Sequence, residues 1–562
     1  MGPALRAMLK LGARARRALW LGLSLSSAAA GQPASADRLE ERPSAAAPAP
    51  SAETPVPAAA PAAPPGAESK PAPFGSAPSA AVPSAPPPLP PDLHGEEGAL
   101  RYLIEDIEIE GNTKTRRRVV EHFVPFHRGD VLDVDDPALE LTRYRLLGTG
   151  FFRNVQLSLR KGSARGRVVL VIAVTERNTL VVTDLAMGLS ADTDEDGRRR
   201  PLAAFAGVAM AERNLAGTGI TLGSALAISQ GATTDEAIDQ FALRVRFFDP
   251  AFLGSRWALS GELLYNDALD FFGNARVMVD DARPQASRSY AVVTYTRSGG
   301  QIGLGYPTSL TTRLWLGYRL ESIGDVQIPR AAASDYRGLV EPIDFEILPG
   351  RSVLSTLRAS IEYDTRDHPW MPTRGWLASA ALELSPAPAG SDYPYEKLDL
   401  KAHRWWTLPH GHVFGLDLFV GAIAGDAPFF EQYYVGDLTD FQPGRLLGLN
   451  FDRRPAPNFL RTAIGQVRYA EYALKLNTEY RVPVYRGTRS VFGIDVFASF
   501  GAFALAGPRE VTRPAPKLSG LQRIPMDLTG NLGFRLDTSL GGFVFTFSNV
   551  LGFLPVRQGE GQ

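Results

Sequence analysis

The sequence predicts a mostly β protein, in which a transmembrane antiparallel β-barrel of about sixteen strands follows one small domain of order β-α-α-β-β. Residues 471–482 show the pattern behind this prediction. Apolar side chains alternate there with charged or small ones at the two-residue period of a strand. The chain has no run of about 18 apolar residues, the length that a spanning helix needs. Since only helices and closed barrels satisfy their backbone groups in lipid, the strands would have to close into a barrel.

The first 99 residues are predicted to be a signal peptide and a tether. Residues 1–36 combine basic residues, a short apolar run at 18–25 and small residues after it, the pattern of a secretory signal peptide. Residues 37–99 are rich in Pro and Ala, so they bury too little apolar surface to offset their ordering entropy and form a disordered linker. The alternatives are an amphipathic anchor helix for the first segment and a wall-binding or partner-binding role for the second.

The composition limits the chemistry that this chain can perform. The 562 residues include no cysteine, which excludes disulfides, thiolate metal sites, a cysteine nucleophile and a lipid-modified N-terminal cysteine. A formal net charge of -1 gives no field that favours nucleic acid. The sequence also lacks the motifs of nucleophilic hydrolases, zinc proteases and phosphate-binding loops. We therefore expect no enzyme activity, no cofactor, no metal and no nucleic-acid partner.

Residues 100–178 are predicted to form the small α/β domain. A strand is expected at residues 103–110 and a helix at 115–123. Asp136 is a plausible N-cap, with Pro137 at the first position of a helix that runs to about Gly148. Two further strands are expected at 155–159 and 168–174. The second is apolar on both faces and should lie centrally in the sheet.

Segments of this domain resemble a POTRA domain in their order and spacing: residues 107–112, 146–155 and 174–176. POTRA domains precede barrels in the BamA/TamA-like outer-membrane assembly superfamily. Segments of the expected barrel, residues 179–562, resemble that superfamily too: residues 212–219, 247–252, 264–267, 363–376 and 427–436. The resemblance covers about residues 100–553 and implies the fold predicted from the strand pattern.

Residues 363–376 are similar to a mid-barrel pattern of the superfamily, Asp-x-Arg-Asp followed by Pro-Thr-x-Gly. The residues that match this barrel-wall motif are Asp364, Arg366, Asp367, Pro372 and Gly375. Taken alone, the two carboxylates and the arginine could form an acid/base constellation. No nucleophile or metal ligand accompanies them, so we expect a structural ion-pair network inside the barrel.

A second motif departs from the superfamily. There, an inward-folded sixth loop carries an arginine in a Val-Arg-Gly-Phe/Tyr motif. The matching residues of the expected lumen loop are Gly436, Phe441, Gln442, Gly444 and Arg445, with Gln442 in the arginine's place; a gapped alternative aligns residues 438–441. Glutamine cannot form the charge-assisted bidentate bond of arginine. Either Arg445 substitutes, or the loop is held in another way.

Charged residues also alternate along expected strands. Arg244 and Arg246 share one strand face, and the same holds for Lys397, Asp399, Lys401 and His403. A charge that faces lipid near the midplane costs roughly 2–4 kcal/mol, so these side chains should line the lumen. The alternative is the outer face of a soluble sheet. The chain also ends in Pro555 and a polar tail instead of a terminal aromatic residue, and our strand count is fifteen or sixteen.

The resemblance implies a protein of the outer membrane, with the POTRA-like domain and linker in the periplasm. It would help unfolded outer-membrane or secreted client proteins to fold into or cross the membrane. Membrane lipid and accessory lipoproteins are further expected partners. An edge strand of the small domain, Val155, Gln156, Leu157, Ser158 and Leu159, would bind an extended client segment. The seam between the strands near Thr179 and Phe553 would offer a second edge. The alternatives are a passive channel, a dedicated secretion pore, or a barrel that anchors a cell-wall tether.

Overall fold

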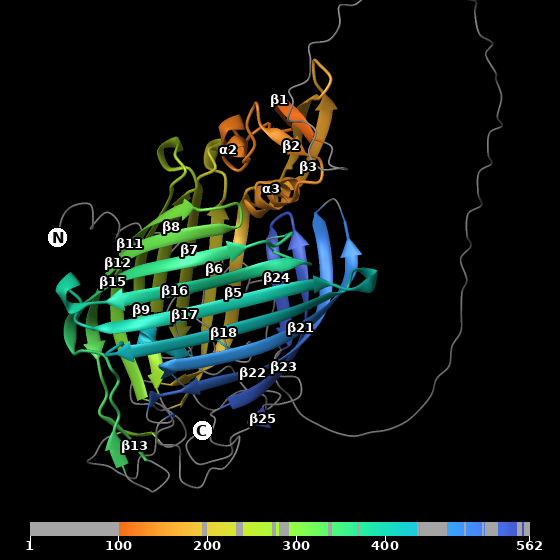
Figure 1. The fold of residues 1–562 in the computed structure, drawn as a ribbon. Coiled ribbons are helices and arrows are strands. Elements are labelled where there is room, and N and C mark those ends of the chain that lie inside the picture. The colour runs from red at the N-terminus through yellow and green to blue at the C-terminus, as the bar shows by residue number, and fades with distance from the viewer. Residues whose placement is uncertain are drawn as a thin grey trace, which may run out of the picture. The chain divides into compact units, whose positions relative to one another are not determined.

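The computed structural model describes residues 101–193, 199–231, 240–272, 277–279, 291–334, 340–368, 370–434, 438, 469–487, 490–508, 511, 526–547 and 554–555. The expected signal peptide and linker lie outside these residues and stay predictions. An α/β domain is followed in the chain by a long sheet that curls into a barrel (Figure 1). No helix in the described ranges is long and apolar enough to cross a membrane.

The α/β domain has a four-stranded sheet of order β2-β1-β4-β3. Its elements are β1 (Arg101–Glu110), α2 (Arg117–His122), β2 (Val131–Asp133), α3 (Pro137–Gly148), β3 (Phe152–Lys161) and β4 (Arg167–Glu176). β4 runs parallel to β1, antiparallel to β3 and lies between them, which confirms its expected central place. The Asp136 carboxylate accepts a hydrogen bond from the Ala138 amide at 2.8 Å, so it caps α3 as predicted. The sequence analysis missed β2, whose three residues are too few to show a period.

Fifteen strands follow one another in the barrel sheet, and each pairs antiparallel with the next. They are β5 (Leu180–Thr193), β6 (Arg199–Glu212), β7 (Thr221–Gly231), β8 (Gln240–Asp249), β9 (Ala258–Phe272), β11 (Ala291–Pro307), β12 (Thr312–Gln327), β15 (Gly350–Asp364), β16 (Gly375–Ser385), β17 (Tyr395–Thr407), β18 (Val413–Gly425), β21 (Tyr472–Arg486), β22 (Val491–Ala506), β23 (Met526–Thr538) and β24 (Gly541–Phe547). A two-residue strand, β25 (Leu554–Pro555), also pairs with β23. The predicted barrel and its approximate size are confirmed.

Short strands lie in the loops between barrel strands. β10 (Val277–Val279), β13 (Ala331–Ser334) and β14 (Val340–Pro342) form a small three-stranded sheet. β19 (Tyr433–Tyr434) pairs with β20 (Tyr469–Ala470). We call the end of the barrel at which β5 begins, directly after the α/β domain, the domain-side mouth. The turns between β6 and β7, β8 and β9, β11 and β12, and β15 and β16 all lie at this mouth, because consecutive strands are antiparallel.

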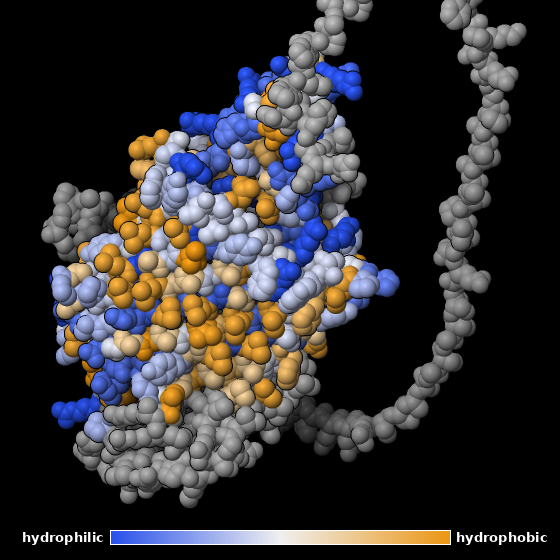
Figure 2. Space-filling model, in the orientation of Figure 1, coloured by the Kyte–Doolittle hydropathy of each residue, from blue (hydrophilic) through white to orange (hydrophobic). Residues whose placement is uncertain are grey.

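The barrel wall is apolar outside and polar inside. On β12, Leu314, Leu316 and Leu320 are exposed, whereas Glu321, from the alternate set, is only 4% exposed. Figure 2 shows the hydrophobic side chains that cover the outside of the wall. Arg244 is buried, whereas the preceding residue on the strand, Leu243, is exposed on the opposite face. This is the arrangement predicted for an Arg244 side chain that lines the lumen. This arrangement is the reverse of a soluble sheet packed on a core and suits a wall in lipid.

The α/β domain is fastened to the first turn at the domain-side mouth. The buried Asn214 side chain donates a hydrogen bond to the Thr115 hydroxyl at 2.9 Å. The Arg116 amide donates to the Gly217 carbonyl at 3.0 Å. Gly217 has a φ of +72°, and a Cβ there would lie 2.0 Å from the Lys114 carbonyl oxygen, so only glycine fits.

The first and last strands of the barrel form its seam. β5 and β24 both run away from the domain-side mouth, because an odd number of antiparallel strands gives them the same direction. The Val182 amide donates to the Leu540 carbonyl at 2.9 Å, just before β24 begins. Beyond this contact, the described residues show no ladder of paired residues between β5 and β24. The seam is therefore joined at the mouth and lacks the ladder that joins all other neighbours.

The pairing of the last strand with β23 is also irregular. Leu532 pairs with Phe547 and Leu528 pairs with Leu554. Between these two pairs, the residue number on β23 changes by four, from Leu532 to Leu528. The residue number on the partner side changes by seven, from Phe547 in β24 to Leu554 in β25.

Candidate functional site

β3 lies at the edge of the α/β sheet, as predicted, and it carries the five residues expected to bind a client. Arg143 of α3 donates from Nε to the Val155 carbonyl at 3.0 Å, so that carbonyl points away from β4. Backbone groups alternate in direction along an antiparallel strand. The backbone groups of Leu157 and Leu159 therefore also face the edge, whereas those of Gln156 and Ser158 face β4. Helix α3 covers the edge at Val155.

The barrel-wall motif builds the turn between β15 and β16. Arg366 pairs with Asp364 through Nη2 and Oδ2 at 2.7 Å. Asp367 Oδ1 accepts hydrogen bonds from the amides of Thr373 at 2.8 Å and Arg374 at 3.2 Å. A Cβ on Gly375, where φ is +107°, would lie 2.3 Å from the Thr365 carbonyl oxygen. These contacts fit the expected structural network and give the acid/base alternative no support.

This turn reaches across the domain-side mouth. Trp370 Nε1 donates to the Leu536 carbonyl on β23 at 3.3 Å. The Pro372 carbonyl accepts a hydrogen bond from Arg481 Nη2 on β21. These strands lie three to five places along the barrel from β16. Arg374, at the end of the turn, pairs with Glu140 of α3. We call residues 365–374, apart from residue 369, the mouth strap.

The strap, the seam and the link to the α/β domain meet at Asp537. Its carboxylate lies 3.7 Å from Arg177 Nη2 and 3.8 Å from His368 Nε2. Arg177 also donates to the Thr538 carbonyl at 3.1 Å. We call this group, together with the bond between Val182 and Leu540, the seam clasp. It joins the start of β5 to the hairpin that leads into β24, so it holds the two seam strands together at the mouth.

His368 holds the strap in its neutral form. Its Nδ1 accepts hydrogen bonds from the amides of Met371 at 3.0 Å and Trp370 at 3.3 Å, which requires an unprotonated nitrogen. Burial lowers the pKa of His368 below its ordinary value, and the negative charge of Asp537 acts in the opposite direction. The histidine is thus both a strap contact and a titratable group within the seam clasp.

Acidification is expected to loosen the mouth strap. The pKa of His368 is lower in the fold than the ordinary 6.5, so below this pH the unfolded strap takes up more protons and its stability falls as the pH falls. Amide exchange of Trp370 and Met371 should therefore be faster at about pH 5.5 than at about pH 7.5, after correction for intrinsic exchange. In His368→Gln this extra acceleration should vanish. Equal acceleration in the two proteins would show that His368 does not control the strap.

A carboxylate anchors a segment inside the barrel. Glu431, only 5% exposed, ends the short helix η6 (Phe429–Glu431). Its Oε1 lies 2.9 Å from Arg319 Nη1 and 3.2 Å from Arg297 Nη2. Lys397, a predicted lumen residue, donates from Nζ to the Glu431 carbonyl at 2.7 Å. The two arginines project from β12 and β11, so the wall holds the segment by three cations.

Aromatic packing surrounds this anchor. Phe430 stacks on Tyr295 with ring centroids 5.2 Å apart, and the Arg297 guanidinium lies 4.3 Å above the Phe430 ring. Tyr433 Oη donates to Asp399, another predicted lumen residue, at 2.7 Å. We call residues 427–434 the inward segment. Its aromatic rings and its carboxylate both contact the inner wall, so it occupies part of the lumen.

The expected lumen-loop residues Gly436, Phe441, Gln442, Gly444 and Arg445 lie outside the described residues, so their role stays a prediction. The described anchor is instead Glu431, which the sequence analysis did not single out. A possible signal was present, because Glu431 is a lone acidic residue beside two phenylalanines in a segment that resembles the superfamily's inward loop. Its two arginine partners are more than a hundred residues away, where local patterns give no pairing.

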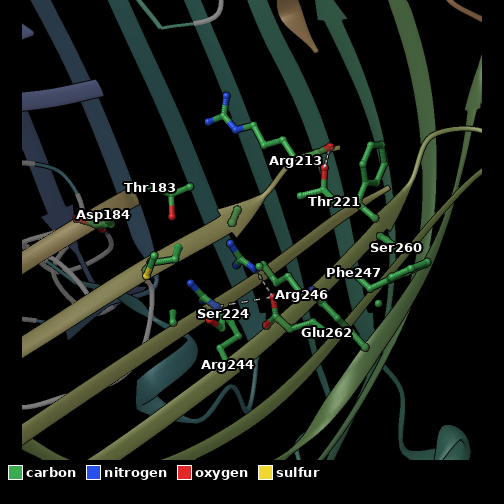
Figure 3. Close-up of a pocket in the computed structure, with 18 residues that line it drawn as sticks. Thr183, Asp184, Arg213, Thr221, Ser224, Arg244, Arg246, Phe247, Ser260 and Glu262 are labelled. Carbon is green, nitrogen blue, oxygen red and sulfur yellow. Dashed lines mark hydrogen bonds and ion pairs between the residues drawn. The ribbon is translucent and has the colours of Figure 1, made fainter. Parts of the chain in front are cut away.

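The wall next to the seam lines an open cavity of about 660 Å³, to which charged and apolar side chains both contribute. Figure 3 shows Arg244 and Arg246 of β8 directed toward Glu262 of β9, with Arg213 at another side. Arg246 Nε lies 2.5 Å from Glu262 Oε2. Asp184 of β5 is also part of the lining, so the cavity reaches the seam strand itself.

Two family models match this chain. A POTRA model, described as a surface antigen variable number repeat, matches residues 102–177, which form the α/β domain. A model of the Omp85 superfamily domain matches residues 214–444. The chain therefore carries a POTRA domain followed by an Omp85 superfamily domain. Its α/β domain is a POTRA domain, and its curled sheet is an Omp85 barrel.

Solved structures of Omp85 proteins resemble this one at low identity. BamA from Haemophilus ducreyi lacking POTRA domains 1–3 is 16% identical, over 83% of this chain and 82% of that chain, with a TM-score of 0.41. CdiB from Escherichia coli is 11% identical, over 81% of this chain and 73% of that chain, with a TM-score of 0.50. No curated protein sequence matches the chain. At this identity, the likeness to CdiB concerns the fold alone.

Proposed function

We propose that this Omp85 protein is an outer-membrane assembly or translocation factor, whose barrel seam is a template for extended segments of client proteins. The seam carries the proposal. In the described residues, β5 and β24 meet at the mouth and form no ladder beyond it, whereas every other pair of neighbours in the barrel sheet is joined by a ladder. Backbone groups without partners are costly in lipid, so an incoming strand that pairs with these edges is stabilised.

The direction of the two seam strands defines the strand that fits between them. β5 and β24 run the same way, so one incoming strand of opposite direction pairs antiparallel with both. Such a strand would need apolar side chains on one face for lipid and small or polar ones on the other for the lumen. Insertion of the client strand only forms and breaks backbone hydrogen bonds, so it needs neither a cofactor nor a nucleotide.

In this proposal the POTRA domain and the linker lie in the periplasm, and the clients are unfolded outer-membrane or secreted proteins. The edge of β3 receives an extended client through the backbone groups of Leu157 and Leu159, beyond the part covered by Arg143. Membrane lipid surrounds the barrel, and accessory lipoproteins are further candidate partners. The proposed domain limits remain 1–36 for the signal peptide, 37–99 for the linker, 100–178 for the POTRA domain and 179–562 for the barrel.

One observation favours a second function, a dedicated secretion pore. Charged side chains line part of the cavity beside β5, so it would suit a polypeptide that passes through the lumen (Figure 3). The inward segment opposes a wide passive channel, because its buried contacts with the wall fill part of the lumen.

Depletion of the protein, followed by quantification of all outer-membrane and secreted proteins, tests the proposal. A joint decrease of many barrel proteins is the result expected for a general assembly factor. Loss of one or a few exported proteins would identify a dedicated pore instead. An unchanged proteome, at confirmed depletion, would contradict both functions.

A further inference from the structure

Three arginines come together where the POTRA domain meets the barrel. Arg145 belongs to α3, Arg256 to the turn between β8 and β9, and Arg313 to the start of β12. The POTRA domain reaches this turn through His122, at the end of α2, whose pKa is lowered by burial and is also affected by the Pro250 backbone and by Asp249. Three separate parts of the chain thus supply one guanidinium group each.

Ring contacts and strand register locate these groups. The Arg256 guanidinium lies 5.8 Å from the centroid of Tyr306. The next residue, Pro307, pairs with Arg313 across β11 and β12, so Arg256 and Arg313 share one hairpin end. The Arg145 guanidinium lies 5.6 Å from the centroid of Phe123, the residue after His122. We call Arg145, Arg256 and Arg313 the junction arginines.

The junction arginines lack a carboxylate partner. Burial and the positive charges of Arg313 and Arg256 lower the pKa of Arg145 to about 10. Within the described ranges, none of the three forms an ion pair with a carboxylate. Asp249 near His122 accepts the Ala251 amide at 3.0 Å, and Glu362, opposite Arg313 in the ladder, does not pair with it. Like charges that lie close together repel one another, so an anion that binds between these guanidinium groups would stabilise the cluster.

The surroundings indicate where that anion comes from. Leu253 and Trp257, from the same turn as Arg256, are 87% and 48% exposed. Trp257 packs on Tyr306 with ring centroids 4.9 Å apart, and the exposed Leu304 and Leu314 continue the apolar surface along the wall. Aromatic side chains beside an apolar wall are typical of the level of lipid headgroups.

We propose that the junction arginines bind the phosphate of an anionic phospholipid in the leaflet at the domain-side mouth. Arginine forks match phosphate oxygens in charge and geometry. The acyl chains would lie along the wall below Trp257. The bound phosphate would neutralise the charge of the junction arginines. It would also join the POTRA domain to the turn between β8 and β9 and to the turn between β11 and β12. This inference rests on the outer-membrane placement proposed above, but not on any client.

Purified full-length protein in detergent, mixed with phosphatidylglycerol or phosphatidylcholine, provides the test. Native mass spectrometry should show that the protein retains phosphatidylglycerol in preference, and its melting temperature should rise with that lipid. The triple variant Arg145→Gln, Arg256→Gln and Arg313→Gln should retain the anionic lipid at least about tenfold less and lose the rise in melting temperature. Exposed POTRA arginines give a control of equal charge change: Arg101→Gln, Arg118→Gln and Arg165→Gln.

Three results would overturn the proposal. The first is equal lipid retention by the triple variant and the wild type. The second is a control variant that loses the lipid as strongly, which would mean that net charge alone attracts it. The third is inorganic phosphate that raises the melting temperature as much as phosphatidylglycerol does, which would make the ligand a free anion. If the triple variant does not fold, the exposed Arg256→Gln alone should weaken retention, and unchanged retention there would also count against the site.

The lipid test is independent of the seam. A protein whose seam is locked should still retain phosphatidylglycerol, because the junction arginines lie on β12, α3 and the turn after β8. Loss of client insertion with normal lipid retention would separate a failure of the seam proposal from a failure of the lipid site.

Discussion

Val182→Cys combined with Leu540→Cys is expected to stop client insertion after oxidation and to restore it after reduction. The Val182 amide and the Leu540 carbonyl are 2.9 Å apart, so the two residues are neighbours at the seam clasp. A disulfide there would hold β5 against the last hairpin, and the edges could not separate. The chain has no cysteine of its own, so this pair is the only one that can form. We expect at least a tenfold lower rate of insertion into vesicles, a loss of about 1.4 kcal/mol or more in transition-state stabilisation.

A matched control places the disulfide within a paired ladder. Met210 and Ser224 face each other across β6 and β7, so Met210→Cys with Ser224→Cys crosslinks two strands that the proposal does not require to part. This control should insert clients equally well when oxidised and reduced. If the oxidised seam pair inserts clients at the wild-type rate, templating at the seam is wrong.

Glu431→Ala is expected to have the second largest effect, on the stability of the inward segment. It removes one carboxylate that the buried Arg297 and Arg319 share, while Glu321 still lies beside both. Breaking a buried ion pair costs about 3–5 kcal/mol, and we expect a loss near the lower end of that range. Limited proteolysis should cut near residues 427–434 much faster, and the heat-induced change in gel mobility should occur at a lower temperature. Glu431→Gln should fall between the wild type and Glu431→Ala, since the amide keeps the shape and some hydrogen bonding.

Glu396→Ala, at an exposed position of β17, is the control and should behave like the wild type. The pairing with Arg319 can be tested by a double-mutant cycle. Because Glu431 and Arg319 belong to one network, Arg319→Ala should cost less in the Glu431→Ala background than alone. Strict additivity of the two substitutions would mean that Glu431 does not anchor the segment through Arg319.

Local features of this fold were predictable from the sequence. The cap at Asp136 with Pro137 fixes the start of α3, because both act on the first helical turn. The apolar faces of residues 168–174 place β4 in the centre of the POTRA sheet. The alternation of charged and apolar residues along the strands also predicted that Arg244 and Lys397 face the lumen. In each case the decisive interaction lies within a few residues or follows from the two faces of a strand.

Contacts between distant segments were not predictable in this way. The barrel-wall motif was expected inside the wall, yet its turn reaches β23 through Trp370. The search for an arginine in the inward loop missed Glu431, whose partners lie on β11 and β12. At this anchor the segment supplies the anion and the wall supplies the cations. A single sequence gives no pairing for such residues.

The odd number of strands gives this barrel a property that no side chain can remove. Around a closed ring, neighbours can alternate in direction throughout only if their number is even. With fifteen strands in the described barrel sheet, one pair of neighbours has to point the same way, and the chain ends place that pair at β5 and β24. Substitutions can strengthen or weaken this joint, but they cannot move it. Parity requires one such joint, and one additional strand from another polypeptide is the smallest change that makes the ring alternate throughout.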